Sequence, residues 1–121
     1  MKKLAVVVTT PPYSNLTRTA LAYIEAAVSA GVEVIGVFFY QDGVINANQG
    51  VAVPNDEFQA IDGWRALNAK HQIPLHLCVS SGEKRGLSDE QPGYNIEACF
   101  CVSGLGELVE LSSRADRVVQ L

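Results

Sequence analysis

Apolar residues alternate along the chain between short unbroken runs and longer runs with a helical period. Residues 4–8 form a run rich in β-branched side chains without polar alternation, which is typical of a strand covered on both faces. Residues 17–30 place their apolar side chains on one helical face, and Gly31 stands where a helix commonly ends. A second buried run at residues 32–39 completes a predicted β-α-β unit, whose strands we expect to be parallel.

The same alternation continues to the end of the chain. Asn55 or Asp56 can cap a helix that runs to about His71. The apolar face of that helix comprises Phe58, Ile61, Trp64 and Leu67. Further buried runs predict strands at residues 75–79, 98–102 and 117–121. Ser103 is the predicted cap of one more helix, which carries Leu105, Leu108 and Val109. Strands alternating with helices indicate an α/β fold with an open, mostly parallel sheet of about five strands.

The carboxyl ends of the predicted strands define the expected functional edge. In open parallel sheets, reaction and ligand sites lie beyond these ends. The rule selects residues 9–14, 40–48, 78–86 and 103–106. Two loops meet this edge, a long one at residues 41–55 and a polar, glycine-rich one at residues 80–93. The loop at residues 41–55 is long for a compact domain, which indicates a function, and an ordered surface loop is the alternative.

Size and charge narrow the class of protein. A chain of 121 residues has room for one domain, residues 1–121. The net charge is −4 and the largest basic cluster is Lys84-Arg85, which disfavours direct nucleic-acid binding. No run approaches the roughly 18 apolar residues that span a bilayer, and no signal peptide is recognised. An odd number of cysteines, three, fits a reducing compartment, so we expect a cytoplasmic protein without membrane contact.

Cys78 is the candidate nucleophile. It ends the predicted strand at residues 75–79, and Lys84 and Arg85 follow within a few positions. The thiolate is the reactive form of cysteine, and a nearby cation or backbone N–H group lowers the pKa of a thiol. This placement suits thiol or persulfide chemistry. The alternative is that Cys78 only fills the core, since cysteine is among the most buried residue types.

Cys99 and Cys101 have the spacing of residues that share one strand face. Packing is their default interpretation, and a resolving thiol for Cys78 is an alternative. A zinc site formed with His76 is conceivable from the ligand types, although the short loops of structural zinc sites are missing. His76 also shares a face with Cys78, but about 6.5–7 Å along the strand is too far for a general base.

Other common chemistries lack their motifs. No P-loop, no glycine-rich dinucleotide loop after the first strand and no nucleophile elbow of a serine hydrolase is present. The acidic residues of a phosphoacceptor domain are missing as well. A loop that binds a flavin phosphate is rich in hydroxyl groups, and the segment with Thr9, Thr10, Ser14 and Thr17 resembles it weakly. Pro11-Pro12 makes this interpretation weaker because proline has no N–H donor. We therefore expect no cofactor and no metal.

Several segments together resemble the DsrE/TusD family of sulfur-relay proteins. They occur in order over nearly the whole chain, and no single one is decisive. The matching segments are Val37-Phe38-Phe39-Tyr40, Asp42-Gly43-Val44, Asn46-Ala47-Asn48-Gln49, Trp64, Leu67-Asn68-Ala69, Cys78-Val79, Arg85-Gly86, Ser103-Gly104-Leu105-Gly106 and Asp116-Arg117-Val118-Val119.

The resemblance implies a flavodoxin-like, three-layer α/β sandwich within a heterohexamer that also contains TusB-type and TusC-type subunits. It further implies a sulfurtransferase in which Cys78 accepts sulfane sulfur as a persulfide from a TusA-type donor. The sulfur then passes to a TusE-type or DsrC-type acceptor. One branch of the family serves 2-thiolation of the tRNA wobble uridine and the other serves dissimilatory sulfur oxidation. The sequence of residues 38–49 is more similar to the branch that serves tRNA thiolation.

The remaining site residues follow from this hypothesis. Lys84 or Arg85 is expected to hold the persulfide anion. Tyr40 and the long loop around Asn46 and Asn48 are expected to shield the anion or admit the partner. Two alternatives from other classes stay open, a non-catalytic assembly subunit in which Cys78 is incidental and a small flavin-binding module.

Overall fold

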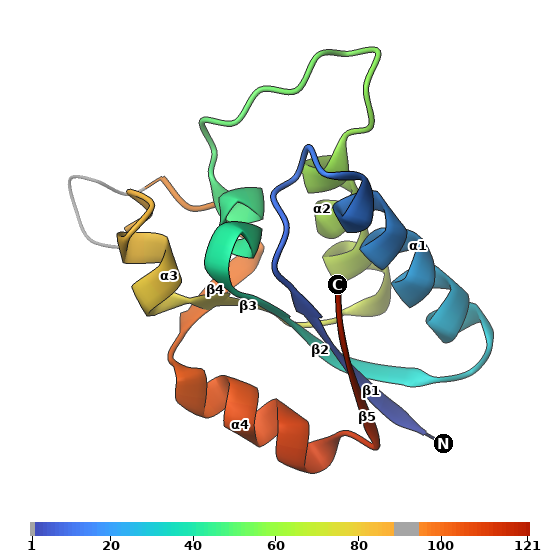
Figure 1. Ribbon diagram of the computed structural model, residues 1–121. Helices are drawn as coiled ribbons and strands as arrows, with labels where there is room; N and C mark the ends of the chain where they lie inside the picture. The colour runs from blue at the N-terminus through green and yellow to red at the C-terminus, as the bar shows by residue number, and fades with distance from the viewer. Residues whose placement is uncertain (1, 89–94) are drawn as a thin grey trace.

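Five parallel strands form one sheet in the order β4-β3-β2-β1-β5 (Figure 1). The computed structural model describes residues 2–88 and 95–121. Its elements are β1 (Lys3–Val8), α1 (Asn15–Ser29), β2 (Glu33–Phe39), the 3-10 helix η1 (Gln41–Ala47), α2 (Ala60–His71), β3 (Leu75–Cys78), α3 (Val79–Glu83), β4 (Phe100–Ser103), α4 (Leu105–Arg114) and β5 (Arg117–Gln120). The predicted α/β fold with a parallel sheet is confirmed.

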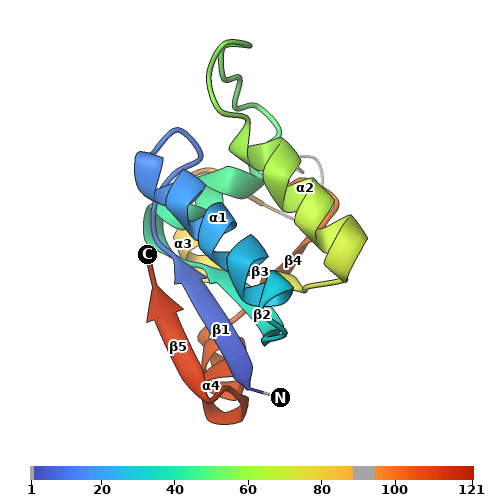
Figure 2. The same ribbon diagram turned by 90° about the vertical axis from the view of Figure 1, so that its right-hand side faces the viewer.

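Helices cover both faces of the sheet, which makes three layers. Helices α1 and α2 lie side by side on one face, and α4 lies on the other (Figures 1 and 2). Phe39 packs edge-on against Trp64 of α2, with ring centroids 4.8 Å apart, and against Phe100 at 5.0 Å. On the opposite face, a Cβ at Gly36 would lie 2.9 Å from Leu111 Cδ2, so glycine lets α4 pack closely against β2.

The start of α2 was predicted too early. The helix begins at Ala60 rather than at Asn55 or Asp56. The side-chain amide of Gln59 donates hydrogen bonds to the carbonyls of three preceding loop residues, so the chain before it stays non-helical. Phe58, expected on the apolar helix face, is 40% exposed and lies under the guanidinium of Arg18.

The prediction for α4 needs a similar correction. Gly104, not Ser103, precedes the first residue of the helix. Of the three apolar residues that the sequence places on this helix, Leu105 and Val109 are 48% and 68% exposed. Leu111 is the buried residue instead, because the helix lies across β1 and β2 with its other face inward.

Two features near β3 and β4 also differ from the prediction. The polar segment at residues 80–93 contains the short helix α3, which begins directly after β3, while residues 89–94 lie outside the described part of the chain. Strand β4 begins at Phe100, so Cys99 stands in a turn before the strand rather than on one strand face with Cys101.

Candidate functional site

Cys78 lies where the sequence places it, at the carboxyl end of β3. It is the last residue of the strand and the residue from which α3 starts, and in the sheet it lies beside Ser103. Its side chain is nevertheless only 1% exposed, as a free thiol. The expected position at the end of a strand is found, and in this conformation the sulfur is closed off from solvent.

A small cavity borders the buried thiol. Its volume is about 10 Å³, roughly the space that one water molecule needs. The lining residues are Leu77, Cys78, Val79, Gly82, Glu83, Leu87, Ser88, Ile96 and Val102. Most are apolar, and Glu83 is the charged residue among them. A persulfide donor therefore cannot reach Cys78 in this conformation without displacing part of the cavity wall.

The two basic residues predicted to support the thiolate do not line that cavity. Arg85 Nε donates a hydrogen bond to Asp42 Oδ1 at 2.8 Å, and Arg85 Nη1 donates to the carbonyl of Ser81 at 3.0 Å. Lys84 is exposed on the surface of the same segment. Arg85 thus joins α3 to η1, and the anion-holding role expected of Lys84 or Arg85 stays a prediction.

Asn46 is a structural residue of this edge. It is completely buried, and its amide nitrogen donates to the carbonyls of Thr10 at 3.0 Å and Gly43 at 2.9 Å. Its amide oxygen accepts a hydrogen bond from Trp64 Nε1 at 2.9 Å. Asn46 joins the loop after β1, η1 and α2, so it supports the loop that is expected to shield the anion or admit the partner.

Asn48 and Tyr40 remain closer to the surface, and both are half-buried. Asn48 ends η1, pairs with Ile96 through an isolated antiparallel bridge, and accepts a hydrogen bond on Oδ1 from the N–H of Gly50 at 2.8 Å. Tyr40 precedes η1 and its ring packs 6.4 Å from that of Phe38. These two residues keep surface that a partner can reach.

Hydroxyl groups complete the network in ways that the sequence pattern did not reveal. Ser81, only 6% exposed, accepts a hydrogen bond on Oγ from the N–H of Gln41 at 3.1 Å. Thr17 Oγ1 donates to the carbonyl of Pro11 at 2.6 Å and lies 2.7 Å from Thr10 Oγ1. Thr17 at the start of α1 and Thr10 in the loop after β1 bond to each other, which further weakens the flavin-phosphate alternative. Only the meeting of distant segments shows these partners.

His76 does not face Cys78 as a base. Its Nδ1 lies 3.2 Å from Ser103 Oγ and its Nε2 lies 3.3 Å from Glu107 Oε1. Burial lowers the pKa of His76, Glu107 acts in the opposite direction, and Arg114 lowers the pKa further. Both ring nitrogens are therefore engaged away from the thiol.

The other cysteines stand apart from Cys78 in environment. Cys101 is exposed on β4, whereas Cys99 is half-buried. Burial raises the pKa of the Cys99 thiol, and the carboxylate of Glu97 adds to that effect. Among residues 2–88 and 95–121, no group of three His, Cys, Asp or Glu side chains is arranged to hold a metal ion, so the conceivable zinc set is not assembled. Within the same ranges, no helix is long and apolar enough to cross a membrane.

Residues 2–121 match the family described as DsrE/DsrF-like. A protein named Sulfurtransferase TusD, from Klebsiella pneumoniae, is 39% identical over 126 residues, covering 98% of either chain. The crystal structure of the ychN protein from E. coli superposes with a TM-score of 0.77 over the full length of both chains. At 23% identity, that likeness concerns the fold.

Proposed function

Because the chain belongs to the DsrE/DsrF-like family, we propose that it is a sulfurtransferase that carries sulfane sulfur as a persulfide on Cys78. Sulfur transfer is the activity that the relative named Sulfurtransferase TusD supports. One observation carries the assignment to a residue. Of the three cysteines, Cys78 ends a strand at the carboxyl edge of the sheet, where reactions occur in open parallel sheets.

The proposed reaction is a pair of thiol–disulfide-like exchanges. The Cys78 thiolate attacks the outer sulfur of a donor persulfide, R–S–SH. A new sulfur–sulfur bond forms at Cys78, the donor's sulfur–sulfur bond breaks, and the donor leaves as the thiolate R–S⁻. The acceptor thiolate then attacks the outer sulfur of Cys78–S–SH in the same way and releases the Cys78 thiolate. The sulfane sulfur keeps its oxidation state, so neither step needs an oxidant or a reductant.

Access is the step that the fold controls. With 1% of Cys78 exposed, each transfer requires the cavity wall next to α3 to move. The two connections from η1 to α3, Gln41 with Ser81 and Asp42 with Arg85, are the contacts that such a movement loosens. The Asp42–Arg85 pair is partly exposed, so breaking that one contact costs little.

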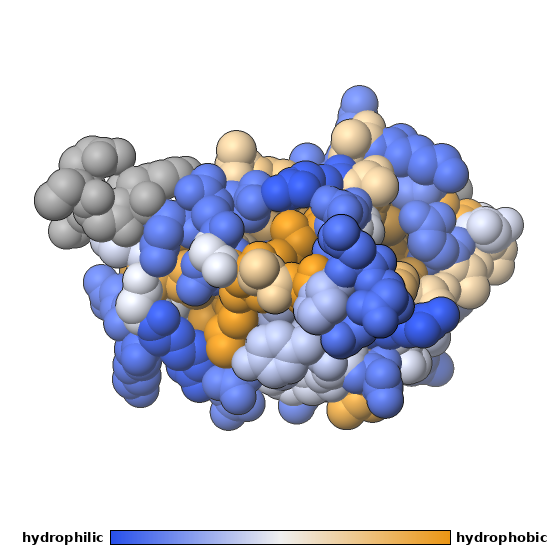
Figure 3. Space-filling view, turned by 90° about the horizontal axis from the view of Figure 1, so that it is seen from above, coloured by the Kyte–Doolittle hydropathy of each residue, from blue (hydrophilic) through white to orange (hydrophobic). Residues whose placement is uncertain are grey.

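A partner protein is the natural agent of this opening. Seen from above, the side of the molecule that carries η1 and the loop before α2 has apolar surface enclosed by polar side chains (Figure 3). Contiguous apolar surface with a polar rim is typical of protein–protein contact sites. We propose that a TusE-type or DsrC-type acceptor and a TusA-type donor dock on this side, within a heterohexamer with TusB-type and TusC-type subunits. In this scheme the protein is cytoplasmic and the sulfur reaches the wobble uridine of tRNA.

The test is to load the protein with glutathione persulfide and to locate the added sulfur by mass spectrometry. Wild type and the matched control Cys101→Ser are expected to gain one sulfur on Cys78, and Cys78→Ser is expected to gain none at that site. Retention of the label in Cys78→Ser together with its loss in Cys101→Ser would overturn the assignment. In cells, 2-thiouridine that is restored by wild type but not by Cys78→Ser supports the tRNA branch, and unchanged 2-thiouridine supports the sulfur-oxidation branch.

The burial of Cys78 favours one second candidate, a non-catalytic assembly subunit. In that case the thiol is a core residue and the complex transfers sulfur through other subunits. Reconstituted complexes distinguish the two functions. Equal transfer rates with wild type and Cys78→Ser identify an assembly subunit, whereas loss of transfer with Cys78→Ser identifies a carrier.

A further inference from the structure

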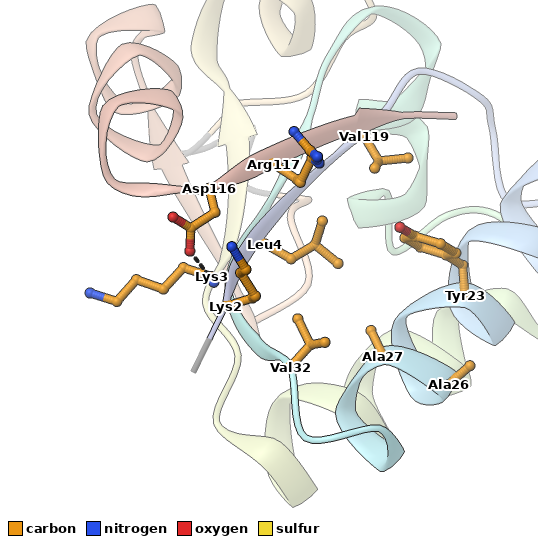
Figure 4. Close-up of a pocket in the computed structure, with 10 residues that line it drawn as sticks. All are labelled: Lys2, Lys3, Leu4, Tyr23, Ala26, Ala27, Val32, Asp116, Arg117 and Val119. Carbon is orange, nitrogen blue, oxygen red and sulfur yellow. Dashed lines mark hydrogen bonds between the residues drawn. The ribbon is translucent and has the colours of Figure 1, made fainter.

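A second candidate site lies on the opposite side of the sheet from Cys78. A groove of about 770 Å³ runs between α1 and the β1–β5 pair (Figure 4). Its lining residues are Lys2, Lys3, Leu4, Tyr23, Ala26, Ala27, Val32, Asp116, Arg117 and Val119. The groove borders the first residues of β1 and β5, whereas Cys78 ends β3. Since all strands are parallel, the groove lies at the amino ends of the strands and Cys78 lies at their carboxyl ends.

The groove exists because the sheet extends beyond its helical cover. Helix α1 packs over β1 and β2, and β5 is added outside β1 at the sheet edge. Val119 and Leu4 therefore present apolar side chains toward α1 without a helix directly above β5. The small side chains of Ala26 and Ala27 leave space on the side of α1 that faces the groove. The ring of Tyr23 closes one end of the groove (Figure 4).

The outer edge of β5 offers free backbone groups. Leu121 donates its N–H to the carbonyl of Val7 and accepts the N–H of Thr9 on its own carbonyl, each at 2.9 Å. Peptide groups alternate in direction along a strand, so those of Gln120 and Val118 point away from β1. Among the strands of the described chain, none pairs with that edge. An unpaired strand edge is a ready template for another extended segment.

The charges at the groove are opposite to the charge of the whole protein. Arg117 shares the groove-facing side of β5 with Val119, and Lys2 shares that side of β1 with Leu4, whereas Lys3 extends away from the groove (Figure 4). Asp116 is the one acidic residue among the described lining residues, and its carboxylate already accepts the N–H of Lys3 at 2.7 Å. A local pair of cations on a protein of net charge −4 favours an acidic partner.

We propose that this groove and the β5 edge bind an extended, acidic segment of a partner protein by strand addition. The segment pairs with the outward peptide groups of β5, sets apolar side chains into the groove and places carboxylates against Lys2 and Arg117. Two observations favour a protein segment over a small molecule. The backbone edge is free, and the groove lies away from the carboxyl ends where small ligands bind in open sheets. Occupation of the groove leaves the Cys78 edge uncovered.

Two synthetic peptides test the proposal by NMR titration of the isotope-labelled full chain. The peptide acetyl-ESVSVSE-amide places valines and terminal carboxylates on one strand face, and acetyl-KSVSVSK-amide reverses its charge. The acidic peptide is expected to shift the amide signals of β5 and α1 and to bind about fivefold or more tightly than the basic one. Equal binding of both peptides, or shifts confined to the Cys78 edge, overturns the proposal.

Variants separate the charge contribution from strand pairing. Arg117→Glu is expected to reverse the preference between the peptides, whereas Lys70→Glu, the same charge change on exposed α2, leaves the preference as in wild type. Gln120→Pro removes an outward N–H and is expected to weaken binding about tenfold, with Gln120→Ala as its control. If Gln120→Pro lowers stability, the reversal by Arg117→Glu decides the outcome. Unchanged preference in Arg117→Glu overturns the proposal.

Two other occupants have their own readouts. Concentration-dependent dimerisation of wild type in sedimentation, abolished by Arg117→Glu, assigns the groove to a second copy of the chain and overturns the proposal. Decanoate that binds more tightly than the acidic peptide, and equally to Gln120→Ala and Gln120→Pro, assigns it to a small amphipathic anion and overturns the proposal as well.

Discussion

The two edges of the sheet differ in how their polar groups are used. At the carboxyl edge, the side chains of Asn46, Ser81 and Arg85 form hydrogen bonds with neighbouring segments of the chain. The cavity beside Cys78 has a volume of only about 10 Å³. At the amino edge, the groove between α1 and β5 measures about 770 Å³, and backbone groups of β5 face outward. The wide groove and the candidate chemistry therefore lie apart.

This difference teaches that position and access have separate causes. Strand topology sets the position of Cys78, because the residue ends a parallel strand. Access depends on side chains that other segments bring to the same edge, and here they close it. A network with every polar group satisfied is rigid, and losing one member is costly. The open groove has no such network and should tolerate substitution.

The contact of η1 with β1 offers the sharpest way to break the closed edge. A Cβ at Gly43 would lie 1.9 Å from the carbonyl oxygen of Val8, which is backbone and cannot rotate away. We expect Gly43→Ala to lower the free energy of unfolding by about 3 kcal/mol or more, measured by urea denaturation. Gly106→Ala is the matched control, because the added Cβ meets no atom there and alanine stabilises a helix by roughly 0.5–1 kcal/mol. A Gly43→Ala protein as stable as wild type contradicts the close contact.

The closure of Cys78 predicts a wide spread of thiol reactivity in the native protein. Exposed Cys101 should react first with iodoacetamide, and half-buried Cys99, whose pKa is raised, more slowly. Cys78 should react roughly 100-fold more slowly than Cys101, equivalent to about 2.7 kcal/mol of local opening. Mass spectrometry of single-cysteine variants measures the three rates. As a control, the three thiols should react at similar rates when the protein is unfolded in urea. Equal native rates for Cys78 and Cys101 mean that the edge is open.

Asn46 and Asn48 form a matched pair within the same loop. Asn46→Ala leaves the buried Trp64 N–H without its partner and removes the amide's bonds to two carbonyls, so we expect a loss of about 2–3 kcal/mol in unfolding free energy. Asn48→Ala removes one half-exposed bond to Gly50 and should cost less than about 1 kcal/mol. Urea denaturation monitored by Trp64 fluorescence measures both. Similar losses in the two variants contradict the distinct roles assigned to the two amides.

His76 should give the smallest effect, a dependence of stability on pH. The pKa of His76 in the folded protein is lowered, mainly by burial, so the unfolded chain binds the proton more readily. Stability is therefore complete above the ordinary histidine pKa of about 6.5 and declines as the pH falls below it. Urea denaturation at several pH values should show a shallower decline for His76→Gln than for wild type. Glu107→Gln should steepen it, because Glu107 raises the pKa of His76. A decline that both variants leave unchanged excludes His76 as its source.

The sequence by itself determined the order of the five strands and of helices α1, α2 and α4 along the chain, and the place of Cys78 at the end of a strand. Unbroken apolar runs and helical periods depend on short-range spacing, which is why β1, β2 and α1 were predicted within two residues of their bounds. The same information located the carboxyl edge and its loops. The sequence could not show that Asn46 and Asn48 have different roles. Asn46 is buried because its amide bonds to Trp64 and Thr10, which are distant in the sequence, whereas Asn48 stays near the surface.

Tertiary structure alone decided access and partners. Arg85 pairs with Asp42, which is 43 residues away in the sequence, instead of approaching Cys78. The groove exists because β5, the last strand in the sequence, lies beside β1, the first, and outside the cover of α1. Neither follows from local pattern, because both depend on which distant segments come together and which side chains remain between them.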